Sequence, residues 1–496
     1  MAQQSELPTT NTGPDPACIP STRLNGNLNV WAIVFLVAAA AAPLGVMSGT
    51  IPIGISIGNG SAFPMTFVVS GIMLLIFAVG YTTLTKYVPN AGAFYAYIAK
   101  GLGNRIGLGS AFLAVVAYLA ETIAVYGLLA AGADSLFVSW GVHLPWQLYA
   151  LVAIGVVSYL GHRHIDVTAK VLGTVMILEV GIILILDVAV IVRGGGPEGF
   201  STAFLDPSTV MSGAPGLALL FAFLSFLGVE ATAVYRNEAR DPNRTVPRAT
   251  YLAISLIGVF YLVSTWALIS AWGDSAAGKV AAENPVAMLP EAMKSYVGAF
   301  AEQVTMVLFV SSLFACVLAF HNIVSRYIFT LAGRGALPKR LGYAHTKHGS
   351  PYLPSALVSV TALVAIGIAS AIGLDPVSQV YTWLAGACTV GFIFLLISVS
   401  LSSIPFFLRQ RAQGALNEKP WGAFIAPAIS AVLLIGTFAL VMMNLSDLVG
   451  GPTAAVVVMA ILLAAYVVGI VVAVMRPEVV IDISEDENEV EPLATS

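Results

Sequence analysis

The chain has 496 residues, of which 58% are hydrophobic and only 10% are charged, and its formal net charge is −4. Water-soluble globular proteins carry charge at about 25% of positions, so this composition excludes a soluble protein and indicates an integral membrane protein. The apolar residues come in blocks of roughly 20 or more, the length at which a helix crosses about 30 Å of hydrocarbon, and not in the alternating pattern of a transmembrane barrel. The sequence therefore predicts an all-α membrane protein.

The two ends of the chain are polar. Residues 1–28 are rich in Pro, Thr and Asn and lack the apolar core of a cleavable signal peptide. Residues 476–496 are strongly acidic, a composition typical of a solvated and disordered segment. We expect both to be short tails without a fold of their own.

Twelve segments are expected to cross the membrane between these tails. They are residues 29–57, 62–87, 105–138, 146–161, 166–192, 213–235, 247–273, 300–331, 353–373, 377–408, 420–445 and 451–475. An even number of spans places both ends of the chain on one side.

Lysine and arginine are distributed unevenly between the two sides that these spans define. With the amino terminus inside, 19 of the 22 basic residues lie at inner tails, loops and helix ends, and only Arg193, Lys279 and Lys294 lie outside. Because positive charge is retained in the cytoplasm, we predict a multi-pass protein of the plasma (inner) membrane with both termini cytoplasmic. The longest outer connection, residues 273–298, is expected to hold a short helix at most.

The first span contains the stretch PLGVMSGTIPIGISIGNG, residues 43–60, with two prolines and five glycines. Proline removes a backbone donor, and glycine costs a helix about 1 kcal/mol relative to alanine, so we predict a break between Gly45 and Gly54. Irregular backbone is tolerated at membrane depth only where it is buried in protein or lines a water-filled cavity. This span is therefore expected to reach the protein interior.

The sixth span carries the stretch FLSFLGVEAT, residues 223–232, in which Gly228 and Glu230 interrupt an apolar run. A single glycine in a membrane helix more often allows close helix packing. A matching interruption five spans earlier instead favours a five-plus-five inverted repeat whose broken helices meet at a central site. We predict repeats at about 29–192 and 213–408, followed by two further spans at about 420–475.

Broken helices of this kind suit a zwitterion. The amino terminus of a half-helix presents N–H groups to a carboxylate, while freed carbonyls suit an ammonium group or a cation. The two interruptions thus predict a site for a small molecule that carries both charges.

Four carboxylates lie within the predicted spans: Glu121, Glu179, Asp187 and Glu230. A charged and unpaired carboxylate costs a few kcal/mol at the bilayer centre, so each is expected to face the protein interior or to be protonated. A carboxyl group that changes between the two forms can carry a proton with the substrate. We predict this coupling role for Glu121, Glu179 and Glu230. The alternatives are a position facing the substrate for Glu121 and helix capping for Glu230, and Asp187 is expected to have a structural role.

Four stretches of the sequence resemble the amino acid–polyamine–organocation (APC) family. The most specific is FLSFLGVEATAVYRNEARDPNRTVPRAT at 223–250, which is similar to the family's sixth helix and the inner loop that follows it. The others are HNIVSRYIFTLAGRGALPKRL at 321–341, YVPNAGAFYAYIAKGLG at 87–103 and, more loosely, VMSGT at 46–50. The resemblance implies the LeuT-like fold with discontinuous helices 1 and 6, alternating access, and secondary transport of amino acids or related amines.

The resemblance also implies a substrate site built from the first, sixth and eighth spans. Its residues are Ser48, Gly49, Thr50, Leu224, Phe226, Leu227, Gly228 and Phe320. Amides of the first span would receive a carboxylate, the carbonyls of Leu224 and Leu227 would receive an ammonium group, and Phe226 would act as a gate. Glu179 falls where many family members have a lysine in a sodium-like position, so coupling through that lysine is not expected. Ser311 and Ser312 are candidates for a sodium site, with packing as the commoner role.

The favoured function is proton-coupled import of an amino acid, and the alternatives are a transporter of polyamines or cationic amino acids and an amino acid exchanger. An ion channel would need repeated carbonyls or a charged ring, and an enzyme would need clustered catalytic side chains; the sequence displays neither pattern. The expected partners are a small-molecule substrate, a coupling ion with H+ favoured, and the lipid bilayer. No cofactor, metal or nucleic acid is expected.

Overall fold

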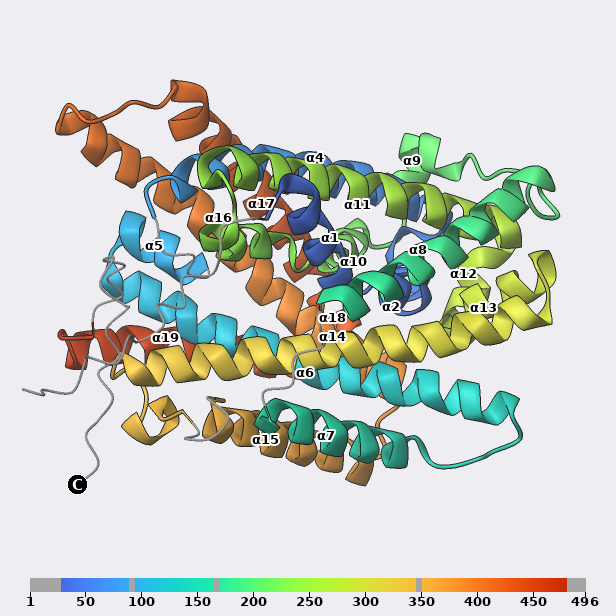
Figure 1. Ribbon diagram of the computed structural model, residues 1–496. Coiled ribbons are helices and arrows are strands. Elements are labelled where there is room, and N and C mark those ends of the chain that lie inside the picture. The colour runs from blue at the N-terminus through green and yellow to red at the C-terminus, as the bar shows by residue number, and fades with distance from the viewer. Residues whose placement is uncertain (1–27, 89–93, 164–168, 345–349, 480–496) are drawn as a thin grey trace, which may run out of the picture.

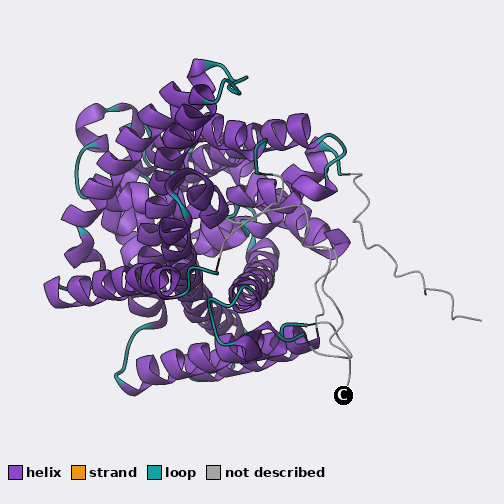
Figure 2. Cartoon of the chain, turned by 90° about the vertical axis from the view of Figure 1, so that its left-hand side faces the viewer, coloured by secondary structure: helices purple, strands orange, loops and turns teal. Residues whose placement is uncertain are grey.

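Helices build the whole described part of the molecule, a computed structural model that describes residues 28–88, 94–163, 169–344 and 350–479 (Figures 1 and 2). Within these ranges the only β-type pairings are two isolated bridges, Leu28 with Ala239 and Gly196 with Gly199. The prediction of an all-α protein is therefore confirmed.

The helices follow the predicted spans closely. The elements that correspond to the first five spans are α1 (Val30–Ala40), α2 (Pro43–Gly45), η1 (Val46–Thr50), α3 (Ile51–Gly54), η2 (Ile55–Asn59), η3 (Gly60–Ala62), α4 (Phe63–Thr85), α6 (Asn104–Ser139), α7 (Trp146–Arg163) and α8 (Ala169–Val192). The next five spans contain α10 (Pro215–Ser225), η5 (Val229–Glu238), α11 (Pro242–Trp272), α14 (Ala299–Gly333), α15 (Tyr352–Ala371), η7 (Pro376–Tyr381) and α16 (Thr382–Ala412). The last two contain η8 (Trp421–Ile425), α17 (Ala426–Met443), α18 (Leu445–Leu448) and α19 (Pro452–Met475).

Ten helical runs of the described chain are long and apolar enough to cross a membrane. One of them, Val30–Thr85, includes the first two predicted spans, and α7 is not among the ten. The chain is thus a multi-pass membrane protein, whereas the count of twelve spans and the limits of the two repeats stay predictions.

The connections hold more helix than the sequence suggested. The prediction of at most one short helix in 273–298 is wrong, because α12 (Asp274–Glu283) and α13 (Pro285–Tyr296) fill it. The Asn284 side chain accepts from the Ala287 N–H and caps α13, which gives this polar stretch a second helix start. Further short elements are α5 (Phe94–Leu102), η4 (Ala203–Leu205), α9 (Pro207–Val210) and η6 (Lys339–Gly342).

The long helix α6 lies at the centre of the bundle and contacts α14, α16 and α19 (Figure 1). Its approach to α19 is very close, since a Cβ atom added to Gly469 would lie 2.7 Å from the Gly109 Cα. Small residues of this kind let helix backbones pack directly in a membrane. The arrangement makes α6 the wall against which the interrupted helices are placed.

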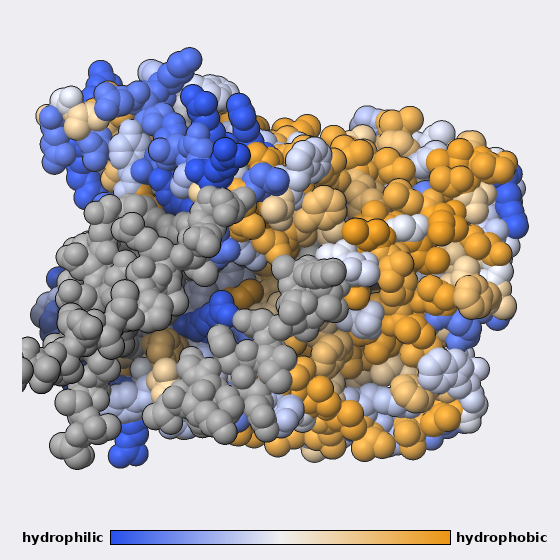
Figure 3. All heavy atoms as spheres, viewed as in Figure 1, coloured by the Kyte–Doolittle hydropathy of each residue, from blue (hydrophilic) through white to orange (hydrophobic). Residues whose placement is uncertain are grey.

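The two described ends of the chain lie at the same end of the bundle (Figure 1). The Leu28 N–H donates to the Glu238 carbonyl at 2.9 Å, and the Asn104 side chain donates to the Val479 carbonyl at 2.6 Å. On the face shown in Figure 3, hydrophilic residues gather towards this end and apolar residues cover the middle and the opposite part. Apolar side chains such as Val432 and Val456, 70% and 68% exposed, suit contact with lipid.

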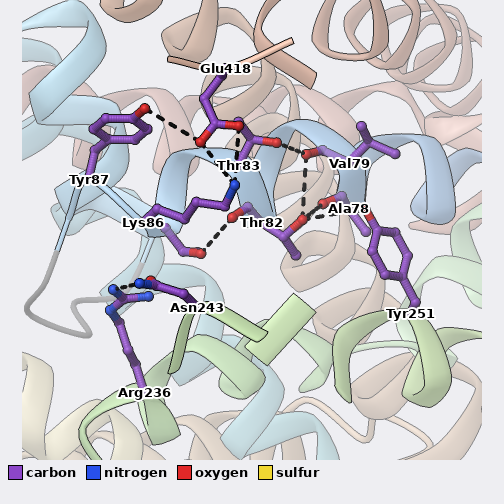
Figure 4. Close-up of polar contacts among 11 residues, drawn as sticks. Ala78, Val79, Thr82, Thr83, Lys86, Tyr87, Arg236, Asn243, Tyr251 and Glu418 are labelled. Atoms are coloured by element: carbon purple, nitrogen blue, oxygen red, sulfur yellow. Dashed lines mark hydrogen bonds and ion pairs between the residues drawn. The ribbon is translucent and has the colours of Figure 1, made fainter. Parts of the chain in front are cut away.

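Polar contacts at this end join α4 to the connection between α16 and α17, and η5 to α11 (Figure 4). The Lys86 ammonium donates to the Glu418 carboxylate at 2.9 Å, linking α4 to the connection between α16 and α17. The Arg236 guanidinium donates to the Asn243 side chain at 2.9 Å at the start of α11. An exposed ion pair contributes only about 0–1 kcal/mol, so the contact of Lys86 with Glu418 positions helix ends rather than dominates stability.

Candidate functional site

The first span is broken immediately before Pro43. Helix α1 ends at Ala40, Ala42 adopts a left-handed conformation with φ 47° and ψ 69°, and α2 begins at Pro43. Proline disfavours the helical conformation in the residue before it and cannot donate a hydrogen bond itself. The predicted position of the break, within Gly45–Gly54, is therefore wrong: the helical run continues through that stretch, with wide π-helical turns in η1 and η2.

Helix α2, which follows the first break, has unpaired backbone N–H groups at its amino terminus. The Leu44 N–H donates to the Glu179 carboxylate at 3.2 Å, and the Val46 N–H donates to the Ala42 carbonyl at 3.0 Å. The N–H groups of Ala42 and Gly45 have no acceptor among the described residues. These are the unpaired donors that attract an anion to a helix amino terminus.

The sixth span is broken at Gly228, as predicted. Helix α10 ends at Ser225, Gly228 has φ 105°, and the chain continues as the 3₁₀ helix η5. Glycine adopts this conformation without the steric cost that other residues have. The Leu224 carbonyl accepts from the Leu227 N–H at 3.0 Å, whereas no donor within the described chain reaches the Leu227 carbonyl.

A small cavity with a volume of about 30 Å³ lies between the two breaks. It is lined by Ala41, Ala42, Gly45, Val46, Thr50, Glu121, Val125, Leu128, Leu224, Leu227, Leu313, Cys316, Phe320 and Tyr381. This volume is room for about two water molecules, so the helices around the cavity have to move apart before a larger ligand enters. Five residues selected from the sequence therefore share one cavity: Thr50, Glu121, Leu224, Leu227 and Phe320.

The polar side chains of the cavity come from three elements. The hydroxyls of Thr50 and Tyr381 are 2.7 Å apart and hydrogen-bonded. Glu121 is only 4% exposed, and its Oε2 atom has no hydrogen-bond partner. Sequence reasoning missed Tyr381, which follows no local motif, and Cys316, whose place one helical turn before Phe320 on α14 was a usable signal.

The other four residues expected to bind substrate do not line this cavity. Ser48 is fully buried and its hydroxyl has no partner, while a Cβ atom on Gly49 would collide with Leu128. The Phe226 ring is fully buried with its centroid 6.3 Å from that of Phe67, so it does not stand over the cavity as a gate. Gly228 contributes the break itself.

Glu179 reaches the first break from α8. Its Oε2 atom accepts from the Leu44 N–H at 3.2 Å and from the Ser312 hydroxyl at 2.8 Å. The carboxyl group is buried and caps the restarted helix from another part of the chain, which suits the positive end of a helix dipole. The Ser312 hydroxyl, a candidate for a sodium site, thus donates a hydrogen bond to the Glu179 carboxyl group.

Glu230 likewise accepts a hydrogen bond from a backbone N–H group, at the second break. Its Oε2 atom accepts from the Gly228 N–H at 2.8 Å, and its Oε1 atom accepts from the Tyr118 hydroxyl at 3.0 Å. The capping role considered for Glu230 therefore matches its contacts. Asp187 accepts from the Ser264 hydroxyl at 2.6 Å between α8 and α11, apart from the residues that line the cavity.

A helical bundle whose two interrupted spans meet at a buried cavity has the architecture of LeuT-like transporters. A solved structure supports this fold class: the chain matches a manganese transporter of Eremococcus coleocola with a TM-score of 0.60 and 15% identity, covering 92% of this chain and 99% of that one.

The amino acid permease family model matches residues 32–484, so the chain belongs to that family. It is 24% identical over 364 residues to the low-affinity putrescine importer PlaP of Escherichia coli, covering 72% of this chain and 76% of the importer. It is 23% identical over 424 residues to a probable GABA permease of Pseudomonas aeruginosa, covering 80% of this chain and 84% of that protein. The resemblance to the APC family is thereby confirmed, and the protein is a transporter and not an enzyme.

Proposed function

We propose that this transporter imports an amino acid across the plasma membrane by alternating access. The observation that carries the proposal is the pairing of unused backbone groups around one cavity: the N–H groups of Ala42 and Gly45 at one break and the carbonyl of Leu227 at the other. The amides would receive a carboxylate and the carbonyl an ammonium group. The carboxylate then binds at Ala42 and Gly45, one turn earlier than the amides expected from the sequence.

The second candidate is import of a diamine, the class that PlaP is named for. A diamine could use the Leu227 carbonyl, but it would leave the N–H groups of Ala42 and Gly45 without an acceptor. Buried donors without acceptors cost free energy. The geometry of the first break therefore favours a substrate with a carboxylate.

We propose protons as the coupling ion, with Glu179 and Glu230 as the carboxyl groups that exchange them. Each accepts a backbone N–H directly at a break, from Leu44 and Gly228 respectively. A charged carboxylate stabilises a helix amino terminus more strongly than a neutral one. Protonation would thus weaken the cap beside the substrate and link proton movement to movement of the broken helices.

We place both termini in the cytoplasm. The described ends of the chain share one end of the bundle, and the basic residues are concentrated on the side where the alternation of spans places both termini. Retention of positive charge in the cytoplasm supports this orientation.

The test is uptake by the purified protein in liposomes. Labelled amino acids and polyamines are offered with an inward proton gradient, an inward sodium gradient or neither. We expect at least one amino acid to accumulate about tenfold more with the proton gradient than without it, and no stimulation by sodium. Uptake that ignores both gradients but requires internal substrate would instead identify an exchanger, and uptake restricted to polyamines would contradict the choice of an amino acid.

A further inference from the structure

Glu121 is the one acidic residue among those that line the cavity between the two breaks, and no lysine, arginine or histidine lines it. The side chain is 4% exposed, and its Oε2 atom is buried without a hydrogen-bond partner. The other three intramembrane carboxylates do not line this cavity. Glu121 is thus set apart by its position and by an unused oxygen.

The Cys388 thiol is a hydrogen-bond partner of the Glu121 carboxyl group, but it carries no positive charge. A buried charged carboxylate without a cation is costly in a membrane protein, and pairing with a cation lowers that cost. The ion pairs between described residues join Lys86 with Glu418, Arg244 with Asp241, Lys279 with Glu283 and Lys294 with Glu302. None of these residues lines the cavity. The described lining of the cavity therefore offers a charged Glu121 no cation, and a positive group on the ligand would supply one.

The proposed binding of an amino acid's backbone leaves Glu121 unused. The carboxylate is received by the amides of the first break, and the α-ammonium group by the Leu227 carbonyl of the second. Glu121 comes from a different wall of the cavity, helix α6. It is left for a second positive group elsewhere on the substrate.

Helix α6 also supplies an apolar surface. A substrate with an α-amino acid group at one end and a second positive group at the other could lay the chain between these groups against it. Glu121, Val125 and Leu128 are spaced four and three residues apart, so they share one face of the helix and span about 10 Å along its axis. Leu313 of α14 adds to the apolar lining. An aliphatic chain suits this surface.

We propose that Glu121 is the specificity-determining residue of the site and selects α-amino acids whose side chain is an aliphatic stem ending in a cation, as in lysine. This inference rests on the proposed function and refines it by naming the substrate class. Neutral amino acids satisfy the two breaks but leave Glu121 unpaired. Diamines satisfy Glu121 but leave the amides of Ala42 and Gly45 unpaired.

Equilibrium binding to the purified full-length protein tests this proposal with three probes. L-Lysine carries all three charged groups, L-norleucine lacks the terminal ammonium group, and cadaverine lacks the carboxylate. For the unchanged protein we expect lysine to bind at least about tenfold tighter than either of the other two.

The Glu121→Gln protein should lose affinity for lysine by about 100-fold, because the terminal ammonium group of lysine loses its carboxylate partner. Its affinity for norleucine, which has no such group, should stay within about threefold. The matched control is Asp187→Asn, a carboxyl group of similar burial outside the cavity, which should keep the preference for lysine. Retention of that preference in Glu121→Gln would overturn the proposal. So would equal affinity of the unchanged protein for lysine and norleucine, a result that does not depend on how the variant folds.

The uptake experiment separates the two levels of inference. If the liposomes take up neutral amino acids and not lysine, the assignment of Glu121 is wrong while amino acid import stands. If they take up no amino acid at all, the proposed function is wrong as well.

Discussion

The Glu179→Gln protein should bind its substrate within a few-fold of the unchanged protein, yet its proton-driven accumulation of substrate should fall by at least about tenfold. Glutamine is similar in volume and keeps an oxygen that can accept from the Leu44 N–H and the Ser312 hydroxyl. It cannot gain or lose a proton. The measurement is uptake into liposomes with and without an inward proton gradient, together with exchange at equal pH on both sides.

The control for this prediction is Asp187→Asn. Asp187 lies on the same helix as Glu179, is buried to the same extent and also accepts from a serine hydroxyl, that of Ser264. It touches neither break, so its neutralisation should leave the stimulation by protons unchanged. Accumulation by Glu179→Gln that follows the proton gradient as in the unchanged protein would rule Glu179 out as a coupling residue.

Replacement of Gly45 by valine should lower uptake more than about tenfold while the protein still folds, because overpacking of this kind typically costs only about 1–3 kcal/mol. Gly45 has φ −59° and ψ −43°, a conformation open to any residue. A Cβ atom there would lie 3.1 Å from Leu313 Cδ2 and 3.5 Å from Ala42 Cβ. The added methyl groups would therefore crowd the unpaired amides at the first break.

Two comparisons complete this experiment. Gly45→Ala should have an intermediate effect, since it adds one carbon at a contact that needs only a small shift. Gly436→Val, on α17, should transport normally because nothing lies within 4 Å of its added Cβ atom. Thermal unfolding in detergent checks that all three variants are folded, and normal uptake by folded Gly45→Val would mean that substrate binds elsewhere.

The positions of the long helices could be predicted because hydrophobicity over about 20 residues is a local property of the sequence. The existence of two breaks could also be predicted, from the glycines and prolines of 43–60 and from Gly228. The position of the first break could not be predicted from the glycines of 45–54, because the break lies at Ala42, directly before Pro43. Alanine is not a residue type that by itself indicates a break. Only the restriction that Pro43 imposes on the preceding residue identifies Ala42 as the position of the break.

The contacts around the first break and in the cavity could not be predicted from the sequence in the same way. Glu179 caps a helix that lies 135 residues earlier, and Tyr381 bonds a hydroxyl 331 residues earlier. Such pairs depend on how α8 and η7 pack against the first span. The sequence could mark Glu179 as an unusual residue, but its partner became evident only from the fold.

The most direct measurement of the central claim is a structure of the protein with a transported amino acid bound. The account predicts density for the ligand between the two breaks, with its carboxylate about 3 Å from the backbone nitrogens of Ala42 and Gly45 and its ammonium group beside the Leu227 carbonyl. Density elsewhere, for example in the second cavity that Glu230 lines with Phe226 and Tyr81, would contradict it.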